Sequence, residues 1–106
     1  MVSFEDFKKL ELKTAKILEA TDHPNADKLL LLKIEVGETQ KQIVAGIKGY
    51  YTTEELIGKT VIIIDNLETA VIRGEESNGM MLVIRDDENL CLLTSDRPVD
   101  SGNNVS

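Results

Sequence analysis

Side chains that could carry out catalysis are few and widely separated in this chain of 106 residues. His23 is the only histidine and Cys91 the only cysteine, so a catalytic triad, a Cys–His pair or a histidine metal site has almost no residues to draw on. The glycines lack the spacing of a phosphate-binding loop, and Glu75 and Glu76 are adjacent in an expected loop, where water solvates them. We therefore predict a protein that is not an enzyme and has no small-molecule substrate.

Structural roles explain His23 and Cys91 better than catalytic roles do. The sequence His23-Pro24-Asn25 is typical of a turn, because proline and asparagine both favour turn geometry. Cys91 lies in an apolar run, which predicts a small buried core residue. One cysteine cannot close an intrachain disulfide, and no apolar run is long enough for a signal peptide or a membrane span. We expect a cytoplasmic protein with no membrane partner.

The net charge of -7 is unfavourable for a nucleic-acid partner, since phosphate contacts come from lysine and arginine. Residues 1–58 hold 8 basic and 10 acidic side chains, whereas residues 59–106 hold 4 and 9. Any basic face must therefore come mainly from the first half. The aromatic residues lie near expected helices rather than within strands, so RNA would be recognised through shape and phosphates instead of base stacking.

The elements expected to position these residues are short strands and two small helices. One helix is predicted over residues 4–9, with Ser3 as its N-cap. The second helix follows Tyr51, where Thr52 and Glu55 have the spacing of a capping box. Gly58 is a natural end for that helix. The last residues, 101–106, are small and polar and are expected to fray.

The rest of the chain predicts an all-β fold in a single domain, residues 1–106. Alternation of apolar residues and turn signals predicts strands over residues 12–20, 29–36, 42–47, 59–66, 79–85 and 89–94. At least five strands, with a helix inserted between the third and the fourth, indicate an OB-fold, which is a five-stranded Greek-key barrel. An open sandwich is the competing architecture.

Several motifs in order resemble one known family. They are His23-Pro24-Asn25-Ala26-Asp27-Lys28-Leu29, residues 42–47, Asn66-Leu67, Arg73-Gly74 and Ser77-Asn78-Gly79-Met80. Together they resemble the tRNA-binding domain found at the carboxy terminus of methionyl-tRNA synthetase and in stand-alone tRNA-binding proteins. The resemblance implies an oligonucleotide-binding barrel that recognises tRNA by its shape, forms a homodimer and needs no cofactor. It also makes methionyl-tRNA synthetase a candidate partner.

The same resemblance suggests residues that contact RNA. Ser77 and Met80 match the family's Ser-x-x-Met at the RNA-facing surface, although Met80 would equally suit core packing in a strand. Arg73 matches a basic loop position, and Asn66 matches a position that alternatively closes a turn. The alternation of Leu29, Leu31 and Lys33 puts Lys33 at the outer end of its strand. The candidate RNA-binding residues are Lys13, Lys16, Lys33, Asn66, Arg73, Ser77 and Met80.

The chain departs from the family pattern at positions that affect phosphate binding and the shape of the first strand. Lys13 stands where the family usually has arginine, which keeps the charge but loses the bidentate fork. Ala15 replaces a glycine in the first strand, and Glu68 replaces a lysine, turning attraction to phosphate into repulsion. We predict weaker tRNA binding than is typical of the family. The alternative is a dimerisation or docking module whose RNA binding is weakened or lost.

Overall fold

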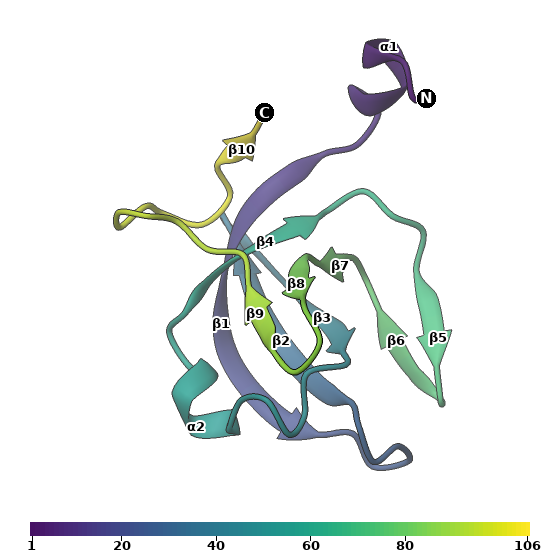
Figure 1. Ribbon diagram of the computed structural model, residues 1–106, viewed down its shortest axis with the longest axis vertical. Helices are drawn as coiled ribbons and strands as arrows, with labels where there is room; N and C mark the ends of the chain where they lie inside the picture. Colours follow the sequence, from purple (N-terminus) through teal and green to yellow (C-terminus); the bar gives the residue numbers. More distant parts are fainter.

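Three long antiparallel strands form the frame of the protein: β1 (Leu12–Asp22), β2 (Leu30–Val36) and β3 (Thr39–Ala45). The free edge of β1 pairs with β4 (Thr60–Ile64), and β7 (Met80–Met81) pairs with β4. The sheet order is therefore β3-β2-β1-β4-β7. A computed structural model describes all residues from 1 to 106, and it shows this sheet curling on itself (Figure 1).

Side-chain and backbone hydrogen bonds close the sheet into a barrel. The segment that joins β6 (Glu75–Ser77) to β7 lies along β3, the far edge of the sheet. The Val44 amide donates to the hydroxyl of Ser77 at 2.9 Å, and the Asn78 amide donates to the Gln42 carbonyl at 2.9 Å. The predicted OB-type barrel is confirmed, with the expected helix between β3 and β4.

That helix, α2 (Thr53–Leu56), begins where the sequence predicted. The Thr52 hydroxyl accepts from the Glu55 amide at 3.2 Å, and the Glu55 carboxylate accepts from the Thr52 amide at 2.8 Å. This capping box fixes the entry of the chain, while Leu56 is fully buried against the barrel. The predicted Gly58 stop has a φ of 87°, the left-handed conformation that glycine adopts most readily.

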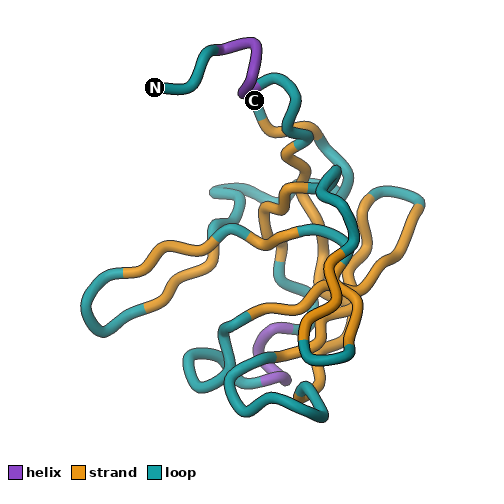
Figure 2. Tube along the Cα trace, turned by 90° about the vertical axis from the view of Figure 1, so that its right-hand side faces the viewer, coloured by secondary structure: helices purple, strands orange, loops and turns teal.

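The amino-terminal helix, α1 (Phe4–Phe7), is shorter than the predicted range 4–9. Its Ser3 cap is confirmed, because the Ser3 hydroxyl accepts from the Asp6 amide at 3.1 Å. Figure 2 shows α1 near the amino terminus, standing apart from the strands of the barrel. No residue of α1 is buried, and neither helix is long and apolar enough to cross a membrane.

Strand β2 shows how the barrel interior is built. Its side chains alternate as predicted: Leu30, Leu32 and Ile34 are no more than 1% exposed, and Lys33 between them is exposed. Branched aliphatic side chains from the other strands fill the same interior. The alternation of a strand that is buried on one side therefore fixes which residues remain on the outer face.

A hairpin that the sequence did not predict follows β4. β5 (Ala70–Ile72) pairs with β6, and only Arg73 and Gly74 connect them. Both residues have positive φ angles, 55° and 89°, which is the geometry of a type I′ turn. The predicted strand 79–85 is divided into β7 and β8 (Val83–Arg85).

Two predictions about the end of the chain are wrong. Cys91 is exposed, because β9 (Leu90–Leu92) pairs only with β8 and its alternation turns Leu90 inward instead. Residues 101–106 are tied down instead of fraying, since β10 (Asn104–Val105) pairs with the start of β1. Small polar side chains here serve to satisfy backbone groups of the barrel, a role that composition alone does not reveal.

Candidate nucleic-acid interface

Two of the predicted lysines share one surface, the outer face of β1, β2 and β3. Lys16 stands opposite Glu35 in the pairing of β1 with β2. Lys33 stands opposite Glu19 on one side and Gln42 on the other. Both lysines are exposed, and neither takes part in an ion pair within the chain. Their ammonium groups are therefore available to an external anion.

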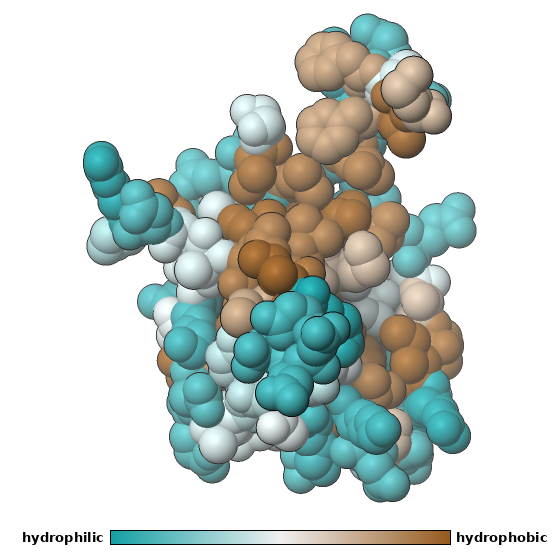
Figure 3. All heavy atoms as spheres, in the orientation of Figure 1, coloured by the Kyte–Doolittle hydropathy of each residue, from teal (hydrophilic) through white to brown (hydrophobic).

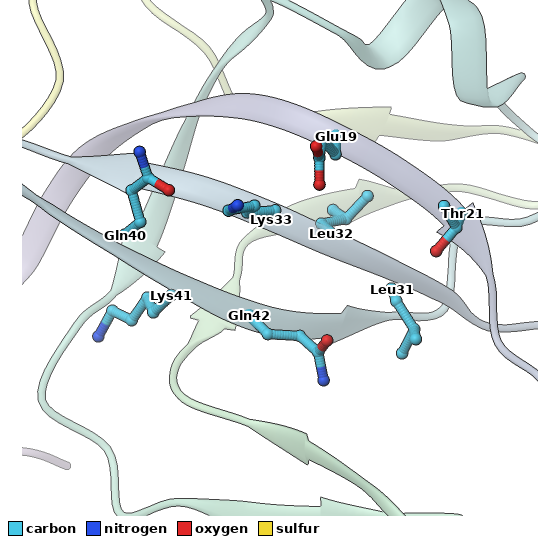
Figure 4. A pocket seen from close by; sticks show the side chains of 8 residues that line it. All are labelled: Glu19, Thr21, Leu31, Leu32, Lys33, Gln40, Lys41 and Gln42. Carbon is cyan, nitrogen blue, oxygen red and sulfur yellow. The ribbon is translucent and has the colours of Figure 1, made fainter.

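This outer face is hollowed between Lys33 and its neighbours. A hollow of about 280 Å³ is lined by Glu19, Thr21, Leu31, Leu32, Lys33, Gln40, Lys41 and Gln42 (Figure 4). The Gln42 side chain is held in place because its amide nitrogen donates to the Glu76 carbonyl at 2.9 Å. Sequence reasoning identified only Lys33 among these residues, because their grouping depends on the pairing of three strands.

Arg73 lies at the rim of this surface, at the tip of the β5–β6 hairpin. The Asn25 side-chain amide donates to the Arg73 carbonyl at 3.2 Å, which links the hairpin to the turn between β1 and β2. A shallow hollow beside it is lined by Arg73 together with Ala26, Asp27, Lys28 and Leu29. The structure thus places Arg73 close to Lys28, a basic residue that the sequence had assigned to the general surface.

His23 holds these two loops together. It is 3% exposed, and both of its ring nitrogens are hydrogen bonded. Nδ1 accepts from the Asn25 amide at 2.9 Å, so Nε2 carries the proton and donates to the Ile72 carbonyl at 2.9 Å. The predicted turn role of His23 is confirmed, and the histidine also positions the hairpin that carries Arg73.

Ser77 and Met80 lie in contrasting environments. Ser77 is 4% exposed, and its hydroxyl accepts from Val44 and donates to the Gly79 carbonyl at 3.2 Å. The hydroxyl therefore uses both its acceptor and its donor capacity within the barrel. Ser77 supports the surface from the interior of the barrel. Met80 is 47% exposed and pairs with Ile64, which leaves its thioether accessible on the outside of the barrel.

The two remaining candidates, Asn66 and Lys13, lie nearer the amino terminus. The Asn66 side chain accepts from the Glu11 amide at 2.8 Å and donates to the Lys9 carbonyl at 2.7 Å. It therefore anchors the segment between α1 and β1. Lys13 is half-buried and stands opposite Ile63, on the other side of β1 from Lys16. The structure places Lys16 and Lys33 on one face of the sheet and Arg73 beside the β1–β2 turn at the end of that face, and it leaves Asn66 and Lys13 elsewhere.

Two carboxylates outside this surface act as capping groups. Hydrogen bonds from Thr52 lower the pKa of Glu55, and hydrogen bonds from Asn89 and Glu88 lower the pKa of Asp86. The Glu55 carboxylate lies in α2 and accepts from the Thr52 amide, and the Asp86 carboxylate accepts from the Glu88 and Asn89 amides in the turn between β8 and β9. No group of three or more His, Cys, Asp or Glu side chains is arranged to hold a metal ion. The surface thus offers hydrogen bonds and charges to a ligand.

Comparison with known proteins identifies the family. Residues 12–104 match the family model described as a putative tRNA binding domain. The chain belongs to this tRNA-binding domain family. The domain is 51% identical over 104 residues to the methionine–tRNA ligase of Pyrococcus horikoshii, and 46% identical over 105 residues to that of Nanoarchaeum equitans. These matches cover 98% and 99% of the domain, which spans 14% of the length of each ligase.

Solved structures agree with this assignment. The tRNA-binding domain superposes on the MetRS related protein of Pyrococcus horikoshii with a TM-score of 0.92 and 27% identity, covering 100% of this chain and 98% of the other. It superposes on the CsaA chaperone protein of Picrophilus torridus with a TM-score of 0.93 and 28% identity, covering 100% of both chains. The expected kinship with methionyl-tRNA synthetase carboxy-terminal domains is confirmed.

Proposed function

We propose that this domain is a cytoplasmic, non-catalytic module that binds tRNA through the outer face of β1, β2 and β3. Family membership supports an RNA ligand. The observation that carries the choice of surface is that Lys16 and Lys33 share this face, exposed and without ion-pair partners, with Arg73 at its rim. The relationship to methionine–tRNA ligases supports action on tRNA as part of, or beside, such a synthetase.

Recognition on this surface would rest on shape and phosphate contacts. The strands hold Lys16 and Lys33 at fixed positions, and the hydrogen bonds of His23 and Asn25 fix the hairpin under Arg73. Phosphates of folded RNA that match these positions gain charge-assisted contacts. Carboxylates on the same face repel phosphates that lie away from these basic side chains. The repulsion favours one orientation of the RNA over nonspecific electrostatic binding.

A gel-shift titration with total tRNA tests this proposal. We expect binding at low salt that weakens steeply as salt rises. Lys16→Ala, Lys33→Ala and Arg73→Ala should each weaken binding, whereas Lys9→Ala should not. Lys9 is a matched control because it is an exposed lysine of the α1 end that pairs with Asp6 at 3.0 Å. Absence of any shift at low salt would contradict the proposal.

We also propose that two copies of the domain associate through the surface that carries α1. Phe4 is 70% exposed, and Phe7 and Leu10 are each 41% exposed. Figure 3 shows hydrophobic surface continuing from α1 over the upper part of the barrel. Apolar surface of this extent is a mark of an interface. Light scattering should give the mass of a dimer, and Phe4→Ser should shift it toward a monomer; a monomer at all concentrations would contradict this.

A docking module with little RNA binding is the second candidate. The net charge of -7 and the exposed Glu68, where a lysine was expected, support it. Arg73→Glu separates the two functions, because a charge reversal at the rim should abolish tRNA binding without touching the α1 surface. Loss of tRNA binding by a variant that stays dimeric would favour the RNA-binding module over the docking module.

A further inference from the structure

The hollow beside Lys33 offers hydrogen-bond acceptors as well as a positive charge. Glu19 and Lys33 face each other across β1 and β2, and Gln42 stands on the other side of Lys33. Figure 4 shows these side chains projecting from three adjacent strands, with Leu31 and Thr21 at one end. A donor and an acceptor of hydrogen bonds therefore stand side by side above a partly apolar floor.

A β-bulge puts the acceptor there. Ile17 pairs with Ile34, but Glu19 pairs with Lys33, so Leu18 is an extra residue in β1. In a regular strand Glu19 would follow the inward face of Ile17, and the bulge turns it to the outer face. The strand is locally distorted, and one result of that distortion is a carboxylate in this hollow.

The charged pair is not satisfied within the protein. Glu19 and Lys33 are both exposed, and no ion pair joins them although they are opposite in register. The amide nitrogen of Gln42 is held by the Glu76 carbonyl at 2.9 Å and the Glu75 carboxylate at 3.3 Å. The carbonyl oxygen of the Gln42 side chain is therefore a second acceptor in a fixed orientation.

We propose that this hollow binds a single unpaired guanine base of the RNA ligand, which rests on the proposed function. The hollow, at about 280 Å³, is below the range of about 300–1,000 Å³ for sites of drug-sized ligands and suits one base. Guanine alone presents two adjacent donors, N1–H and N2–H, which match the Glu19 carboxylate. Its O6 and N7 acceptors match the Lys33 ammonium.

The other bases fit this arrangement less well. Adenine places the N1 acceptor, and cytosine the N3 acceptor, where guanine has a donor, so the Glu19 carboxylate would meet a lone pair. Uracil offers a single N–H between two carbonyls. A site built around hydrogen bonds rejects a base that leaves its polar groups unpaired. The structure thus assigns base selectivity to Glu19, while Lys33 contributes attraction as well.

Short oligoribonucleotides that differ at one base test the assignment. The probes are UUGUU, UUAUU, UUCUU and UUUUU, titrated into the ¹⁵N-labelled protein and followed by amide chemical shifts. We expect UUGUU to bind about tenfold more tightly than the others, within the range of a bidentate base contact. The amides that shift should be those of Glu19, Lys33 and Gln42.

Two variants with the same charge change provide the control. Glu19→Gln should reduce the preference for UUGUU to within about twofold, because an amide cannot accept both donors. Glu38→Gln, in the exposed turn between β2 and β3 and outside the hollow, should keep it. Retention of the preference in Glu19→Gln would overturn the assignment. If tRNA binds but no oligonucleotide preference appears, only the guanine site is wrong; if neither binds, the proposed function fails with it.

Discussion

Ser77 offers a test of how the barrel and its RNA surface are related. Replacing it with alanine removes the oxygen that accepts from the Val44 amide at 2.9 Å and donates to the Gly79 carbonyl at 3.2 Å. Ser77 is 4% exposed, so water cannot readily replace it. An unsatisfied buried amide costs about 1–3 kcal/mol. For a domain of this size that lowers Tm by about 4–12 °C.

Thermal unfolding followed by circular dichroism measures this loss. Ser95→Ala is the matched control, because Ser95 is half-buried and its hydroxyl makes no hydrogen bond within the chain. Below its Tm, Ser77→Ala should bind tRNA with an affinity within about twofold of that of the parent, because the hydroxyl bonds to backbone groups of the barrel. A variant with unchanged Tm and lost tRNA binding would refute this reasoning and make Ser77 a direct contact.

Three further predictions concern the supports of the surface. Gly102→Ala should lower Tm strongly, because its Cβ would lie 2.6 Å from the Gly37 Cα and the residue has a φ of 83°; an unchanged Tm in thermal unfolding would contradict this. His23→Ala should both raise the rate of amide hydrogen exchange in β5 and weaken tRNA binding. Faster exchange with unchanged tRNA affinity would show that the position of the hairpin does not matter for binding. Interactions with Thr52 lower the pKa of Glu55 below 4.5, so the stability they contribute is present above that pH and lost as pH falls through the folded pKa. Denaturant titrations should show Glu55→Gln to be less stable than the parent at pH 7 and equal to it in strong acid.

Local signals allowed much of the fold to be predicted. The caps at Ser3 and Thr52 depend on residues only three positions away, and the structure contains both. The alternation of β2 fixed its buried face because one side of the strand lines a core. These features need no knowledge of the rest of the chain.

Features that depend on distant pairing could not be predicted. β10 pairs with β1 from the opposite end of the chain, and Thr14 accepts there from the Asn103 amide at 3.0 Å. The turn at Arg73-Gly74 lacks the Asn-Gly or Asp-Gly signal that marks type I′ turns. The bulge that turns Glu19 outward has no signature in the order of the residues. The sequence therefore predicted the basic residues of the candidate site but not the hollow beside them.

The most direct test of tRNA binding by this surface is the salt dependence of affinity for a variant with Lys16, Lys33 and Arg73 all replaced by alanine. Each phosphate contact contributes about 0.7–0.9 to the slope of log K against log salt concentration. We predict that the slope of the triple variant is smaller than that of the parent by about 1.4 to 2.7, the lower value applying where Lys33 contacts a base and only Lys16 and Arg73 contact phosphates. An equal slope and equal affinity would contradict the account and place tRNA on another surface of the domain.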